Sequence, residues 1–187
     1  MKSLAFPPQN HAKGNDMAAA IGIVLGSAGD WPEVEPAARW LLERGIPVEV
    51  VVASAHRAPQ KVQAYAREAA GRGLKVIIAA AGMAAHLAGV LAAETTLPVI
   101  GVPLPGSPLQ GLDSLLSTVQ MPAGVPVATM AIGRAGARNA AIFAAQILAL
   151  SDPRLPEILA QHKQELARQV AQQAEQIPAE FRKSSET

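Results

Sequence analysis

The chain has no cysteine among its 187 residues, and few of its residues are aromatic. The lack of cysteine excludes disulfide bonds, thiolate catalysis and metal sites with cysteine ligands. Aromatic residues make up 3% of the sequence, whereas half of all residues are hydrophobic. The core must therefore be built from alanine, valine, leucine and isoleucine, and the length allows one domain with a sizeable core.

The sequence also lacks an excess of charge of either sign. It has 16 basic and 15 acidic residues, a net charge of +1 and no basic block, which argues against a nucleic-acid-binding surface. A stretch over residues 76–93 carries no charge apart from that of a protonated His86. Its glycines and many alanines favour a strand, a turn and a buried helix over a membrane span. The start of the chain has no long apolar run, so we expect no signal peptide and a cytoplasmic protein.

Short apolar runs alternate with helical segments along the chain. The runs are continuous rather than alternating, which is typical of strands buried on both faces, and they cover residues 21–25, 48–52, 76–80, 98–102 and 125–131. Helices are predicted over residues 31–44, 59–70, 83–94, 112–119, 135–150 and 155–177. This alternation predicts an α/β fold with a parallel sheet, covered by helices on both faces through right-handed crossovers.

We expect one α/β domain over residues 18–152, after a flexible leader at 1–17 and before a C-terminal helix and tail at 153–187. The helix at 135–150 is apolar nearly all round, which predicts burial on more than one side and hence a second subunit. The last helix is polar with a narrow apolar stripe, as in an arm that packs on its own or a neighbouring subunit. His162 falls on this stripe and is interpreted as a packed or solvated histidine.

Chemistry-bearing side chains gather in the sequence SAHRAP at residues 54–59, directly after the second predicted strand. Pro59 suits the first turn of a helix, so Ser54, His56 and Arg57 lie on a loop at the carboxyl end of a parallel strand, where ligands bind in open α/β sheets. An imidazole titrates near neutrality, and a guanidinium suits phosphate or carboxylate. Together they indicate proton transfer on an anionic substrate, although a capped loop with a surface arginine explains them equally well.

Two further loops leave the same edge of the predicted sheet. Residues 26–30 supply Ser27, Asp30 and a helix N-terminus, where backbone N–H groups and the helix dipole favour a phosphate. Asp30 either accepts hydrogen bonds from sugar hydroxyls or only caps its helix. Residues 81–86 supply His86, which is either a second acid–base group or a structural histidine.

Motifs of several other enzyme classes are missing. The sequence contains no G-x-G-x-x-G after its first strand, no Walker A motif, no H-E-x-x-H and no G-x-S-x-G, and it has no clustered carboxylates that suggest a metal site. His56 is therefore the plausible acid–base group.

Seven segments between residues 20 and 150 resemble, in order, the N5-carboxyaminoimidazole ribonucleotide mutase family of purine biosynthesis. They are GSAGDW (26–31), SAHRAP (54–59), VIIAAAGMAAHLAG (76–89), LPVIGVP (97–103), GLDSLLSTVQMP (111–122), GVPVATMAIG (124–133) and NAAIFAAQIL (139–148).

The resemblance implies a flavodoxin-like three-layer αβα sandwich with a five-stranded sheet, and a homo-octamer with sites at subunit contacts. It implies conversion of N5-carboxyaminoimidazole ribonucleotide to 4-carboxy-5-aminoimidazole ribonucleotide without a metal or organic cofactor, and a functional link to the ATP-dependent synthetase of the pathway. His56 matches the catalytic histidine of the family. The residues implied to contact the ribonucleotide are Ser27, Asp30, Ser54, Arg57, Gly82 and His86.

The chain departs from the family pattern at four positions. Gly29 replaces the usual serine, Ala80 and Met83 replace glycines, and Ala88 replaces a proline. The last three are expected beside the pocket that holds CO2, with Met83 either walling that pocket or packed between helices. The loop at residues 103–111 also differs and is a candidate wall or lid.

Two other functions remain open from the sequence. One is the related carboxylase, which combines free CO2 with 5-aminoimidazole ribonucleotide; that branch tends to have lysine in place of Arg57 and no proline at position 59, so the sequence favours the mutase. The other is a relative that binds a ribonucleotide without converting it.

Overall fold

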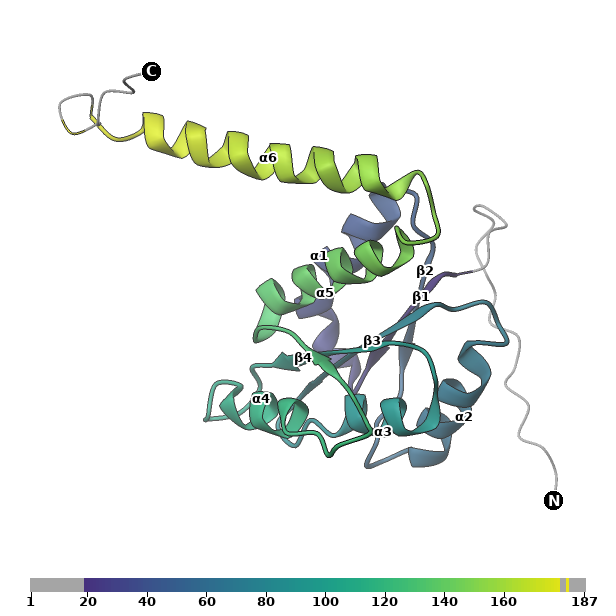
Figure 1. Cartoon of the computed structure of the whole chain (residues 1–187). Coiled ribbons are helices and arrows are strands. Elements are labelled where there is room, and N and C mark those ends of the chain that lie inside the picture. Colours follow the sequence, from purple (N-terminus) through teal and green to yellow (C-terminus); the bar gives the residue numbers. More distant parts are fainter. Residues whose placement is uncertain (1–18, 179–180, 182–187) are drawn as a thin grey trace.

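The computed structural model describes residues 19–178 and residue 181, so the expected leader at 1–17 lies outside the described residues. In this part of the chain five parallel strands form one sheet with helices on both faces (Figure 1). The strand order is β2-β1-β3-β4-β5, the order of flavodoxin-like folds. The strands are β1 (Ile21–Leu25), β2 (Val48–Val52), β3 (Val76–Gly82), β4 (Val99–Leu104) and β5 (Ala128–Thr129).

Helices cover the sheet in two layers, which confirms the three-layer sandwich. Figure 1 shows α1 and α5 on one face and α2, α3 and α4 on the other. The helices are α1 (Trp31–Glu43), α2 (Pro59–Ala69), α3 (Leu87–Glu94), α4 (Leu112–Val119), α5 (Gly133–Leu148) and α6 (Leu155–Glu175), and a short 3-10 helix, η1 (Ala28–Asp30), precedes α1.

Each face of the sheet has its own apolar core, because successive strand side chains point to opposite faces. Ile23 of β1 packs toward α1 and α5, whereas its neighbour Val24 packs toward α2 and α3. Trp40 is the largest fully buried side chain of the first core. The buried side of α5 is built largely of alanine, so α5 packs closely on α1 without bulky side chains.

Several element boundaries differ from the sequence prediction. The fifth strand pairs only at residues 128–129 rather than over 125–131. Its late start fits Pro126, which has no N–H group for a ladder hydrogen bond. The helix expected from residue 83 begins only at Leu87. Met83 has φ of 57°, which no right-handed helix accommodates. Phe143 of α5 is 37% exposed in this one chain, and the burial of α5 on more than one side, which was expected to involve a second subunit, stays a prediction.

The last helix, α6, extends away from the domain in Figure 1. Only Leu155 and His162 of this helix are buried, whereas Leu166 and Val170 are exposed apolar side chains on its outer part. Within the described residues, no helix combines the length and the apolar character that a membrane crossing needs.

Candidate functional site

Two loops meet at the carboxyl edge of the sheet and bring two histidines together. His56 follows β2 and His86 follows β3, and His56 Nε2 lies 2.9 Å from His86 Nδ1. Their ring centroids are 5.1 Å apart with the ring planes at 84°. Because β1 lies between β2 and β3 in the sheet, the pair sits beside the carboxyl end of β1. This is the point at which the strand order reverses, the usual ligand position in such sheets.

His86 lies at a different place in its loop from the one predicted. It occupies the position before the first residue of α3 rather than a position one turn into a helix. Its carbonyl oxygen accepts a hydrogen bond from Val90 N at 3.0 Å, and its own N–H donates to Ala84 O at 2.9 Å. The backbone of His86 is thus fixed by the start of the helix while its side chain is exposed.

Arg57 joins the loop after β2 to the loop after β1. Its Nη2 donates to Gly26 O at 3.2 Å, and Ser54 Oγ accepts from both Arg57 N at 3.2 Å and Arg57 Nε at 3.4 Å. The side chain of Arg57 is exposed to solvent, as is that of His56. The two loops therefore present a cation whose position is set by a hydroxyl and a backbone carbonyl.

The loop after β1 is closed by a reciprocal cap. Ser27 N donates to Asp30 Oδ2 at 2.8 Å, and Gly29 N donates to Ser27 Oγ at 3.3 Å. Asp30 makes no side-chain cap to α1, so that part of the sequence prediction is wrong. Burial raises the pKa of the Asp30 carboxyl, against the opposing effects of the Ser27 N–H and the Arg57 charge.

The four departures from the family pattern fall into two environments. Ala80 and Ala88 are buried in the core, whereas Gly29 and Met83 are exposed. Met83 is 60% exposed, so the prediction that it packs between helices is wrong. Gly82 ends β3, and a Cβ on it would lie 3.3 Å from the carbonyl oxygen of Leu104. Close packing against β4 therefore favours glycine at this position, which also lies at the start of the loop that carries His86.

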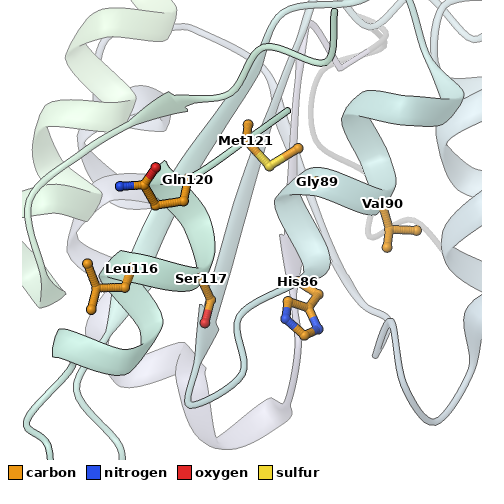
Figure 2. Close-up of a pocket in the computed structure, with 7 residues that line it drawn as sticks. All are labelled: His86, Gly89, Val90, Leu116, Ser117, Gln120 and Met121. Carbon is orange, nitrogen blue, oxygen red and sulfur yellow. The ribbon is translucent and has the colours of Figure 1, made fainter. Parts of the chain in front are cut away.

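A cavity of about 420 Å³ lies between α3 and α4, with His86 on one side and α4 residues on the other (Figure 2). Sequence reasoning missed the residues that α4 and the following segment contribute to it. These residues belong to the segment GLDSLLSTVQMP (111–122), which in the sequence indicated only the resemblance to the family. The lining residues are His86, Gly89, Val90, Leu116, Ser117, Gln120 and Met121.

In residues 19–178 and 181, no three or more histidine, aspartate or glutamate side chains are grouped as a metal ion would need. The loop at residues 103–111, the candidate wall or lid, contributes none of the residues that line the cavity.

Comparisons with known proteins show the family of this chain. The family model described as AIR carboxylase matches residues 20–169. N5-carboxyaminoimidazole ribonucleotide mutase of Pseudomonas aeruginosa is 56% identical over 147 residues, which cover 79% of this chain and 90% of that protein. The mutase of Bacillus subtilis is 50% identical over 161 residues, or 86% of this chain and 99% of that protein.

A solved structure agrees with the sequence comparisons. The crystal structure of Treponema denticola PurE superimposes with a TM-score of 0.74 at 25% identity, covering 84% of this chain and 97% of that chain. The match to the family model spans all five strands and most of the helices. The chain belongs to the AIR carboxylase family.

Proposed function

We propose that the chain converts N5-carboxyaminoimidazole ribonucleotide to 4-carboxy-5-aminoimidazole ribonucleotide in purine biosynthesis. The observation that carries the proposal is the pair formed by His56 and His86 at the carboxyl edge of the sheet, with Arg57 in the next position. The curated relatives with 48–56% identity that bear the mutase name support the same reaction.

The reaction needs one proton to enter the substrate and one to leave it. When the bond between nitrogen and the carboxyl carbon breaks, its electron pair stays on nitrogen, which takes a proton from His56, and CO2 is released. The ring carbon then bonds to CO2, and the proton on that carbon passes to His56. One imidazole thus serves as acid and then as base, a contribution that is typically ~10²–10⁴-fold.

Ser27, Asp30, Ser54, Arg57 and the Gly82 loop are proposed to hold the ribonucleotide. Arg57 is the cation of this edge that suits the phosphate, and the dipole of α1 favours the same group near the N-terminus of that helix. The Asp30 oxygen that does not accept from Ser27 N is proposed to accept from a sugar hydroxyl.

We also propose that the protein is a cytoplasmic homo-oligomer, an octamer by resemblance, in which residues 18–152 form the catalytic domain and the C-terminal helix packs on a subunit. Exposed apolar side chains on two elements support this assembly. Leu112, Leu116 and Val119 are each about half exposed along α4, and Leu166 and Val170 are exposed on α6.

A substrate comparison tests the proposed function. The purified protein should convert the carboxyamino substrate with no added bicarbonate, and it should convert 5-aminoimidazole ribonucleotide with bicarbonate much more slowly. The His56→Asn variant serves as the control for contaminating activity. If only 5-aminoimidazole ribonucleotide with bicarbonate is converted, the protein is the carboxylase. If the protein binds either compound but converts neither, its role is non-catalytic.

A further inference from the structure

We propose that His86 is a positioning residue that acts through His56. It holds the His56 imidazole in one orientation and in the tautomer with its proton on Nε2, so that Nδ1 is the nitrogen that gives and takes the proton. The proposal deepens the proposed function and rests on it, because a histidine that carries no proton to a substrate needs no fixed tautomer.

The geometry of the pair sets the location of one proton. The bond between His56 Nε2 and His86 Nδ1 is 2.9 Å long, so one of these nitrogens donates and the other accepts. A protonated His56 carries N–H groups on both nitrogens, and it can keep the bond only by donating from Nε2. His86 then accepts at Nδ1 and carries its own proton on Nε2, which requires that His86 stay neutral.

The proton shared by the pair fits the proposed reaction. The facing nitrogens, His56 Nε2 and His86 Nδ1, can form their hydrogen bond only while one of them carries a proton and the other does not. The reaction consumes one proton as CO2 leaves and returns one as the ring carbon is deprotonated. A pair that carries one exchangeable proton is sufficient for both halves.

The surroundings leave this role to His86 alone. Within the described residues, neither ring forms another side-chain hydrogen bond or a salt bridge. The charged groups of the adjoining loops are Asp30, whose carboxylate is bound by Ser27 N, and Arg57, whose guanidinium is bound by Gly26 O. On the other side, the α3 and α4 residues that share the cavity with His86 are all neutral.

The two histidines differ in how their positions are fixed. The backbone of His86 is held by the first turn of α3, whereas His56 lies in a loop closed by the hydrogen bond from Ala58 N to Ser54 O at 2.9 Å. Both side chains are exposed, so packing does not restrict the His56 ring. The bond to His86 is the contact that selects its rotamer and its tautomer.

Three substitutions of His86 test the proposal through kinetics. Oδ1 of asparagine occupies the place of histidine Nδ1, so His86→Asn keeps an acceptor for His56, whereas His86→Gln moves the amide one bond further and His86→Leu removes it. We expect His86→Leu to lower kcat about 10- to 100-fold, part of the acid–base contribution, with KM changed less than threefold. The pH profile of kcat should shift with it, and His86→Asn should restore most of kcat while His86→Gln does not.

A measurement without substrate separates this proposal from the proposed function. In protein labelled with ¹⁵N-histidine, the ring nitrogens of His56, assigned with the single variants, should show the proton on Nε2 at neutral pH. In His86→Leu the signals should move toward a tautomer mixture. If the ¹⁵N signals behave as expected in both proteins but the parent protein converts no substrate, only the proposed function is overturned. A His56 proton on Nδ1, or a His86→Leu effect confined to KM, would overturn the positioning role.

Discussion

The histidine pair at the sheet edge and the histidine on the C-terminal arm are held in opposite ways. His56 is exposed, and one of its ring nitrogens is hydrogen-bonded to His86. His162 is only 7% exposed, its Nδ1 has no hydrogen-bond partner, and its ring packs against Trp40 with centroids 5.3 Å apart. The first environment leaves a hydrogen-bonded imidazole open to solvent, whereas the second buries an imidazole against an indole ring.

Charge strengthens this difference. Burial lowers the pKa of His162, the nearby Arg138 and Arg44 lower it further, and Glu165 opposes them. Both arginines also lie over the ring of Trp40, at 4.3 Å for Arg44 and 5.4 Å for Arg138. A third cation at this indole is unfavourable, so His162 serves as a neutral packing group that docks α6 on α1 and α5.

The largest expected effect comes from removing the exposed imidazole. His56→Asn should fold and bind the ribonucleotide but lose turnover by the ~10²–10⁴-fold that acid–base catalysis contributes. The matched control is His162→Asn, which should leave turnover per folded molecule unchanged. Steady-state assays of both variants check the prediction, and more than about a tenth of the activity remaining in His56→Asn would contradict it.

Two arginines extend the same comparison. Arg57→Ala should weaken binding of the product about 10- to 100-fold, the loss of a charge-assisted hydrogen bond of about 1.5–3 kcal/mol, with little change in stability. Arg44 donates to Trp40 O at 3.3 Å and lies over its ring, so Arg44→Ala should lower stability without changing affinity. Calorimetric binding and urea unfolding measure both, and an unchanged affinity in Arg57→Ala would refute its role.

Acid should undock the arm histidine. Because the pKa of His162 is lower in the folded protein than in the unfolded chain, the unfolded chain binds more protons below about pH 6.5. The stabilisation by neutral His162 is therefore complete above that pH and is lost as the pH falls through the lowered folded-state pKa. Urea unfolding at pH 7.5 and 5.5 should show this loss.

The control for the acid effect is His162→Leu, in which no group titrates at this position. The drop in stability between the two pH values should be smaller in this variant than in the parent protein. An equal drop in both proteins would assign the effect to other groups.

The sequence was sufficient to predict the parallel sheet, the two helical layers and the three loops that carry the candidate site. It did not predict the contact between His56 and His86, because this depends on β1 lying between β2 and β3, and strand order is a tertiary property. It also misplaced the start of α3, since nothing in the residue type of Met83 indicates a positive φ. The predicted capping of α1 by Asp30 is wrong because the Asp30 carboxylate accepts from Ser27 N at the start of η1 instead.

Met83 has an exposed side chain, as His56 does, but its backbone is held in a strained conformation. Its φ of 57° is in the left-handed region, which costs a non-glycine residue about 1–2 kcal/mol. Glycine relieves this strain but adds about 0.5–1 kcal/mol of backbone entropy on folding. Met83→Gly should thus raise the free energy of unfolding by up to about 1.5 kcal/mol, and not lower it by the ~2–5 kcal/mol that truncation of a buried methionine costs.

Two matched variants separate the backbone of Met83 from its side chain. Gln110 is another non-glycine residue with positive φ, at 51°, so Gln110→Gly should give the same relief of strain at a different loop. Met83→Ala removes the side chain while the backbone stays strained. If the Met83 side chain walls the site in which CO2 is held, both Met83 variants should release more free CO2 per turnover, whereas Gln110→Gly should not. Equal CO2 release in all three variants and the parent protein would limit Met83 to a structural effect on the loop that carries His86.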